Sequence, residues 1–235
     1  MHKFIDKIKK NEAKPSIIKN FINNKEIEKF QKLYFKLPVE INNRRQNIIK
    51  KKWSSNFFPD LQQLYKDKLR SVLKDYLMDN PKTKDGLESL GLFQESFKPV
   101  SLHVDSGFDF NKIIYKQTLL PLSEKGETVI FKNRFYGKST NFTIDKNELE
   151  LTKLNYGQNI RSNKHIGMFG NKPFSIEDHK KYLEHEKIEN LIGLEIELVY
   201  EWELGSMLIF DRTSLHCSSS KIEGKKIGLT TFTKK

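Results

Sequence analysis

The first third of the chain carries apolar residues at helical spacing. A capping pair, Asn23 and Asn24, precedes one run with spacings of three and four, made of Ile27, Phe30, Leu33 and Tyr34. Pro59 and the N-cap candidate Asp60 precede a longer stripe, made of Leu61, Leu64, Tyr65, Leu69, Val72, Leu73, Tyr76 and Leu77. The pattern predicts two amphipathic helices whose stripes pack against a core.

A basic run lies between these two predicted helices. It consists of Arg44, Arg45, Lys50, Lys51 and Lys52. Runs of this kind are usually solvated faces, and we expect the same here.

The pattern changes near Phe93 to short apolar runs that alternate with turns. Residues 100–104, 113–122 and 128–131 read as strands, and Pro121 fits a strand end or edge. The stretch 132–172 is rich in Asn, Lys and Gly, which predicts loops with one short strand. Ser175 can cap a short helix over 176–186.

The last quarter of the chain is strongly β-like. Apolar residues alternate with acidic ones over 194–202, and further short runs cover 207–210, 215–217 and 226–233. We therefore predict an α+β protein and a single domain over 1–235. Residues 1–92 are expected to be mainly helical, and 93–235 to form a β-sandwich or barrel with a loop-rich insertion at about 132–190.

Composition agrees with one sizeable core in a chain of 235 residues, since 17 Phe, 8 Tyr and 2 Trp supply bulky side chains. The net charge of +12 permits nucleic-acid or membrane-surface binding, but the lysines are scattered. Cys217 is the one cysteine in the sequence, which excludes an intramolecular disulfide. Without a signal-like or membrane-length apolar run, we expect a cytoplasmic protein that does not enter membranes.

Three residues carry the chemistry of a metal site. His103 and Asp105 are two positions apart on a predicted strand, so both side chains can reach one ion. His216 on a later strand would add a second imidazole. Two imidazoles and one carboxylate suit ferrous iron with open coordination positions. The His-x-Asp pair alone is a weak signal, because short motifs arise by chance.

A cation follows the distal histidine at a fixed distance. Lys226 lies ten positions after His216, on the next predicted strand beyond a turn at Glu223 and Gly224. An ammonium group there can bind a carboxylate as a buried charge pair. Lys225 is the rival, but neighbours on a strand face opposite ways.

With these motifs the chain resembles the Fe(II)- and 2-oxoglutarate-dependent oxygenases, in particular the prolyl-hydroxylase and phytanoyl-CoA-hydroxylase types. The resemblance extends over about residues 98–233 and rests on His103-Val104-Asp105, segments 118–123, 126–131 and 205–216, and Lys226. It implies a double-stranded β-helix (jelly-roll) core with the N-terminal helices packed on one sheet. It also implies a dioxygenase that requires Fe(II), 2-oxoglutarate and O2, hydroxylates a C–H bond and releases succinate and CO2.

The resemblance assigns His103, Asp105 and His216 as metal ligands and Lys226 as the group that binds the 5-carboxylate of 2-oxoglutarate. One departure is that the family often has Arg followed two residues later by Ser or Thr, whereas Gly228 follows Lys226. The second contact to the co-substrate must then come from elsewhere. The long insertion between Asp105 and His216 leaves the substrate residues open.

Several other residues are weaker candidates. Gln117 and Tyr115 share a strand face and compete for a hydrogen bond to the co-substrate, with Thr128 behind them. Arg134, Arg161 and Arg212 are candidate substrate contacts. Solvated loop residues are the favoured reading for the loop-rich stretch, which also holds Tyr136 and Asn159, and Arg212 can instead pair with Asp211 or a nearby Glu. Cys217 is expected to face away from the metal.

Three alternatives remain open at this point. One is a non-catalytic jelly-roll protein with a degenerate site, which would not bind divalent metal. Another is a protein that acts on nucleic acid, which would bind it with steep salt dependence. The last is a zinc or manganese isomerase or hydrolase that turns over without 2-oxoglutarate. We expect a small-molecule substrate, because there is no added recognition domain, and the oligomeric state is open.

Overall fold

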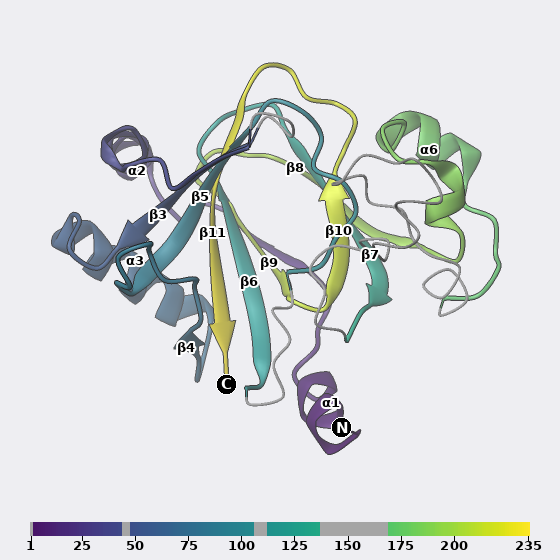
Figure 1. Cartoon of the computed structure of the whole chain (residues 1–235), viewed down its shortest axis with the longest axis horizontal. Coiled ribbons are helices and arrows are strands. Elements are labelled where there is room, and N and C mark those ends of the chain that lie inside the picture. Colours follow the sequence, from purple (N-terminus) through teal and green to yellow (C-terminus); the bar gives the residue numbers. More distant parts are fainter. Residues whose placement is uncertain (1, 44–47, 106–111, 137–168) are drawn as a thin grey trace.

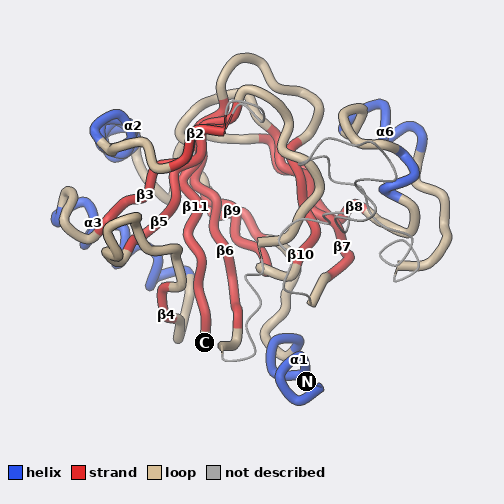
Figure 2. Tube along the Cα trace, in the orientation of Figure 1, coloured by secondary structure: helices blue, strands red, loops and turns tan. Residues whose placement is uncertain are grey.

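The computed structural model describes residues 2–43, 48–105, 112–136 and 169–235, and it is built mainly from two antiparallel β-sheets that face each other (Figures 1 and 2). The larger sheet contains, in spatial order, β1 (Ser16–Ile18), β9 (Met207–Asp211), β6 (Ile114–Pro121), β11 (Lys226–Lys234), β5 (Ser89–Ser96), β3 (Ile48–Ser54) and β2 (Ile41–Asn43), with β4 (Leu77–Met78) paired to β11. The smaller sheet contains β10 (Ser214–Ser218), β7 (Glu127–Arg134) and β8 (Ile196–Glu201).

Helices α2 (Asn24–Lys36) and α3 (Pro59–Val72) form where the apolar stripes predict them. Asn23 caps α2 through a reciprocal pair of hydrogen bonds: its side chain accepts from the Glu26 N–H at 3.0 Å, and the Glu26 carboxylate accepts from the Asn23 N–H at 2.8 Å. Pro59 begins α3 and Asp60 lies in its first turn, so Phe58 rather than Asp60 is the N-cap residue.

Helix α3 ends earlier than its stripe predicts. Leu73 is extended and Asp75 has a φ of 50°, so the chain leaves the helix after Val72 and Leu77 joins β4. Further short helices are α1 (His2–Lys9), α6 (Ile176–Tyr182) and a 3₁₀ turn, η1 (Ile188–Leu191). Among the described residues, no helix has the length and apolar character needed to cross a lipid bilayer.

The first 92 residues contribute more β-structure than the hydrophobic pattern predicts. Strands β1 to β4 and the start of β5 lie in this part, and β3 pairs with β5 along its length. The hydrophobic pattern did not predict β3, because the lysines of the basic run interrupt the alternation of apolar and polar residues on that strand. On that strand Lys51 packs against Tyr34 of α2, where its ammonium lies 4.3 Å from the ring centroid, and is buried rather than solvated.

The two faces of the larger sheet have different partners. Trp53, Phe93 and Leu229 project toward α2 and α3 and share one apolar cluster with Phe30 and Tyr65 of those helices. Phe30 and Trp53 pack edge to face with 5.6 Å between ring centroids. Residues one position away along the same strands face the smaller sheet. The helices thus cover one face and leave the other face free for a site.

Candidate metal centre and its cavity

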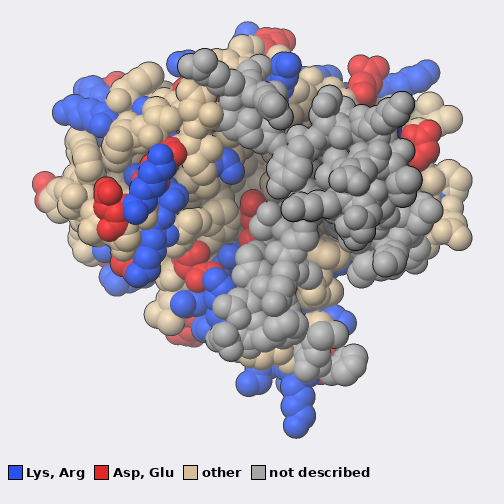
Figure 3. All heavy atoms as spheres, in the orientation of Figure 1, with Lys and Arg blue, Asp and Glu red and all other residues tan. Residues whose placement is uncertain are grey.

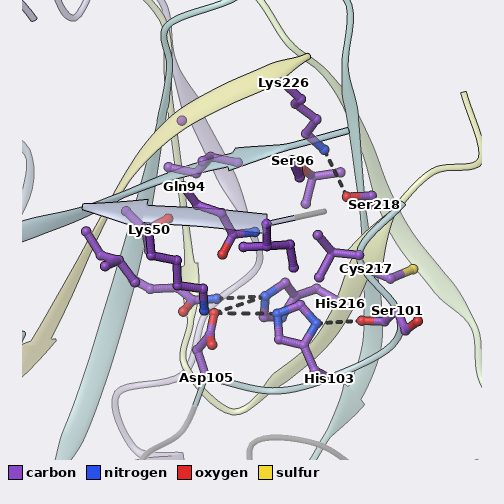
Figure 4. A pocket seen from close by; sticks show the side chains of 18 of the residues that line it. Lys50, Gln94, Ser96, Ser101, His103, Asp105, His216, Cys217, Ser218 and Lys226 are labelled. Carbon is purple, nitrogen blue, oxygen red and sulfur yellow. Dashed lines mark hydrogen bonds and ion pairs between the residues drawn. The ribbon is translucent and has the colours of Figure 1, made fainter. Parts of the chain in front are cut away.

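A cavity of about 560 Å³ lies between the two sheets. The larger sheet lines it with alternate residues of β3, β5, β6 and β11, and the smaller sheet contributes residues of β7 and β10. Figure 4 shows side chains of both sheets converging on this space. The cavity has the size of a small-molecule site.

His103, Asp105 and His216 come together in this cavity, and their potential ligand atoms lie within 4.8 Å of one another. The Nε2 atoms of His103 and His216 lie 3.7 Å and 3.3 Å from the same carboxylate oxygen of Asp105. The centroids of the two imidazole rings are 4.2 Å apart. The structure thus brings together the three residues that the sequence offered as candidate metal ligands.

The main chain brings the two histidines together. His103 N donates to His216 O at 2.9 Å and His216 N donates to His103 O at 3.0 Å, so the residues form an isolated β-bridge. The strand predicted over 100–104 does not form around this bridge. Backbone groups in and next to this segment bond to side chains instead of to a neighbouring strand: Leu102 N donates to the Glu186 carboxylate, and the Asp105 carbonyl accepts from Arg212.

Both imidazoles present the same nitrogen to the cavity. Nδ1 of His103 donates to Ser101 O at 2.7 Å, and Nδ1 of His216 donates to Ser214 O at 3.0 Å. A carbonyl can only accept, so Nδ1 carries the proton and Nε2 of the neutral ring carries a lone pair. This is the tautomer that a metal-binding histidine uses.

The electrostatics of the three residues favour a cation between them. Burial, with the nearby His216, lowers the pKa of His103 to about 4, so its ring is neutral near pH 7. Burial alone would raise the pKa of the Asp105 carboxyl, but His103, His216 and Lys50 together hold that pKa well below its usual range. The Asp105 carboxylate and the lone pair of the neutral His103 ring then face one another. A metal ion would relieve this repulsion.

Lys226 lies in the same cavity with its ammonium buried. Its Nζ donates to Glu127 O at 2.9 Å and to Ser218 Oγ at 3.1 Å, and it lies 4.3 Å from the Trp202 ring centroid. Burial lowers the pKa of Lys226 to about 7. An ammonium has three donor hydrogens, and these two bonds leave one for an anionic ligand.

Comparison with solved structures identifies the fold. Over its whole length the chain matches 87% of HygX from Streptomyces hygroscopicus with nickel, 2-oxoglutarate and hygromycin B bound, at 14% identity and a TM-score of 0.52. It matches 84% of the epimerase SnoN in complex with Fe3+, α-ketoglutarate and nogalamycin RO over 98% of its own length, at 6% identity and a TM-score of 0.51. The chain shares the fold of the 2-oxoglutarate–iron oxygenases. No protein-family model and no curated protein matches the sequence.

Lys226 and Lys225 face opposite ways, as neighbours in an extended chain do. Lys226 faces the space between the sheets, whereas Lys225 is exposed, with its Nζ 3.9 Å from a Glu95 carboxylate oxygen. Gly228, the next residue on the Lys226 face, leaves room for Trp202. A Cβ atom at Gly228 would lie 3.0 Å from Trp202 Cη2. The indole therefore occupies space beside Lys226 that a larger side chain at position 228 would fill.

Gln117 and Tyr115 are separated by the structure. Gln117 lines the cavity with its Nε2 3.4 Å from His216 Nε2, and its buried Oε1 has no hydrogen-bond partner among the residues that the structure describes. Tyr115 lines a smaller cavity of about 160 Å³, where the Lys235 ammonium lies 4.3 Å from the centroid of its ring. The register of β6 on β11 shifts opposite Phe232, and this breaks the alternation that predicted a common face.

The predicted substrate residues lie in different places. Arg212 lines the cavity but is held by the protein: Nε donates to Asp105 O at 3.1 Å and Nη1 to Asp79 Oδ2 at 2.6 Å. Arg134 lies outside the described cavity lining, with its guanidinium 3.4 Å from carboxylate oxygens of Glu197 and Asp211. Arg161 lies outside the described residues.

The side chains of Thr128 and Cys217 lie in different surroundings. Thr128 lines the cavity and its hydroxyl accepts from Trp202 Nε1 at 3.0 Å. Cys217 belongs to the apolar cluster behind the smaller sheet, and Figure 4 shows its sulfur directed away from the two imidazole rings, as predicted.

Lys50 is a cavity residue that the sequence reading missed. It projects from β3 toward the cluster of His103, Asp105 and His216, and Figure 4 shows its amine near Asp105. Ile48 and Lys50 are two positions apart and both line the cavity, which is the spacing of residues on one face of a strand. Two further lysines on β3 made this spacing hard to recognise in the sequence.

On the face drawn in Figure 3, Lys and Arg side chains are spread among Asp and Glu rather than gathered in one patch.

Proposed function

We propose that this protein is an Fe(II)- and 2-oxoglutarate-dependent dioxygenase that oxidises a C–H bond of a small molecule and releases succinate and CO2. Its core would be the double-stranded β-helix of that enzyme class, with α2 and α3 packed on the larger sheet of one domain. The observation that carries the proposal is the convergence of His103, Asp105 and His216 in a cavity that also holds the Lys226 ammonium.

The three residues fit a ferrous ion by their chemistry. Two imidazole nitrogens with fixed tautomers and one ionised carboxylate form the donor set typical of non-haem iron oxygenases. Bound iron would supply the redox chemistry that couples the decarboxylation of 2-oxoglutarate by O2 to oxidation of the substrate. The protein's own contribution is to fix the ligands before the ion arrives.

The Lys226 side of the cavity fits the co-substrate. Its remaining donor hydrogen would bind the 5-carboxylate of 2-oxoglutarate, with the Ser218 hydroxyl beside it. The Gln117 side-chain NH2 group, which lies 3.4 Å from His216 Nε2, would donate a hydrogen bond to the co-substrate. The Trp202 ring excludes water from the ammonium and strengthens the charge pair.

Hydroxylation is the proposed outcome for the substrate. SnoN, which has the same fold, is described as an epimerase, so the fold accommodates more than one fate of an oxidised substrate. HygX and SnoN were solved with hygromycin B and nogalamycin RO, and a small-molecule substrate is what we propose here.

Succinate release tests the proposal. We expect the purified protein with Fe(II), O2 and 2-oxoglutarate to release succinate slowly without substrate, and faster with an accepted member of a substrate panel. His103→Ala should release none above background. His179→Ala is the matched control, because its imidazole hydrogen-bonds to the Glu186 carbonyl and is not part of the triad. Equal rates in wild type and His103→Ala would contradict the proposal.

A further inference from the structure

Lys50 occupies a distinct position in the cavity wall. It pairs in register with Gln94 of β5, and Gln94 pairs with Gly228 of β11, so the three residues form one row across the larger sheet. Lys226 lies two residues before Gly228 on β11, opposite Ser96. Lys50 and Lys226 are separated by one strand, which places their backbones roughly 10 Å apart across the sheet.

The Lys50 ammonium lacks a close acidic partner among the described residues. None of their carboxylates forms an ion pair with it, although neighbouring Lys51 and Lys52 on β3 have polar partners. Figure 4 shows the Lys50 side chain running across the cavity toward Asp105, on the far side from Lys226.

The charges that line the cavity do not balance once the proposed ligands are bound. Among the described residues, the ionisable side chains other than histidine and cysteine are Lys50, Lys98, Lys226, Arg212, Asp79 and Asp105. Asp79 and Arg212 pair with each other. A divalent ion and the 2-oxoglutarate dianion would cancel the charges of Asp105 and Lys226. Lys50 and the exposed Lys98 then remain, so the rest of the cavity attracts an anion.

We propose that the primary substrate is a small organic acid, and that Lys50 binds its carboxylate or phosphate group beside the metal-binding triad. This inference rests on the proposed function and names the substrate class of the same site. Lys226 serves the co-substrate and Lys50 serves the substrate, because the two ammonium groups lie on different strands with different neighbours. Lys98 at the exposed side of the cavity adds attraction as the acid enters.

Matched pairs of probes test this assignment. The protein, loaded with Zn(II) and 2-oxoglutarate, is titrated with benzoate against benzamide and with phenyl phosphate against phenol, and binding is followed by ligand-observed NMR. We expect at least one acid to bind about tenfold more tightly than its neutral partner, since a charge-assisted contact contributes about 1.5 kcal/mol or more. The two pairs show whether the group is a carboxylate or a phosphate.

Variants connect the preference to Lys50. Lys50→Met should abolish the difference between acid and neutral probe, and Lys50→Arg should keep it. Lys52→Met is the matched control from the same strand, because Lys52 pairs with Glu40 at 3.2 Å. The inference is overturned if neither acid binds more tightly than its partner, or if Lys50→Met keeps the preference.

The same titration separates this inference from the proposed function. The affinity for 2-oxoglutarate should stay within about twofold in Lys50→Met and fall more than tenfold in Lys226→Met. A wild-type protein that binds neither metal nor 2-oxoglutarate would defeat the proposed function. Titration of the metal-free protein with the same acid and neutral probes would still show whether acid binding depends on Lys50.

Discussion

The main chains of His103 and His216 are hydrogen-bonded to each other in both directions, at 2.9 Å and 3.0 Å, although the residues are far apart in the sequence. Each imidazole is further fixed by the hydrogen bond from its Nδ1 to a carbonyl two residues earlier. The positions of both rings are therefore set by backbone contacts within the fold.

A preformed site predicts that metal stabilises the protein without refolding it. Mn(II) at about one hundred times its Kd should raise the free energy of unfolding by about 3 kcal/mol and raise Tm, since only the folded state has the site. Far-UV circular dichroism should stay unchanged. Asp105→Asn should lose most of the stabilisation. A large gain of secondary structure on addition of Mn(II) would contradict a preformed site.

Binding of 2-oxoglutarate should depend on pH through Lys226. Burial lowers the pKa of its ammonium to about 7, so below that pH it is charged and ready to bind a carboxylate. Above pH 7 binding must take up a proton, and the affinity should fall by up to about tenfold per pH unit. Calorimetry on Mn(II)-loaded protein at about pH 6 and about pH 8.5 measures this effect. Lys226→Arg is the control, because a guanidinium stays charged and should give a flat profile.

Glu186 should make the protein less stable as the pH rises. Its buried carboxyl accepts from Leu102 N at 2.6 Å, and burial raises its pKa to about 7. The folded state therefore holds this proton more tightly than the unfolded state. That stability is fully present below the unfolded pKa and is lost as pH rises to about 7, a cost of about 3 kcal/mol at most.

Glu186→Gln tests this pH dependence. The amide oxygen can still accept from Leu102 N but does not ionise, so the variant should be more stable than wild type at about pH 8 and similar at about pH 4. Thermal unfolding across this range provides the measurement. A constant difference in Tm at all pH values would show that ionisation of Glu186 is not the cause.

Gly228 should not tolerate a side chain. An added Cβ would lie 2.8 Å from Leu119 Cδ1 and 3.0 Å from Trp202 Cη2, so one of these groups must move. Gly228→Ala should cost about 1–3 kcal/mol of stability, as overpacking does. It should also weaken 2-oxoglutarate binding, because Trp202 packs on Lys226. Unchanged Tm and unchanged affinity would refute this role for the glycine.

Local rules were sufficient where the deciding contacts are close in the sequence. The capping box of Asn23 and Glu26, the strands after residue 113 and the opposite facing of Lys225 and Lys226 all follow from short-range patterns. Strand β3 did not, because the aliphatic stem and ammonium of Lys51 pack on Tyr34 of another element. A buried lysine in a polar run cannot be distinguished from a solvated one by pattern alone.

The candidate site also contains residues that the sequence could assign and residues that it could not. The grouping of His103, Asp105 and His216 could be predicted from the sequence because few residue types can serve as ligands of a divalent metal. Arg212 and Lys50 could not be assigned, because their roles depend on partners from distant segments. Asp79 and the Asp105 carbonyl hold Arg212, whereas the Lys50 ammonium is directed into the cavity.

Calorimetric titration of the apo-protein with Mn(II) is the most direct measurement of the metal centre. Wild type should bind one equivalent, and His216→Ala and Asp105→Asn should each lose at least about tenfold in affinity, as removal of a ligand implies. His179→Ala should bind as wild type does. Unchanged Mn(II) affinity in His216→Ala and Asp105→Asn would show that these side chains do not hold a metal, and would contradict the oxygenase proposal.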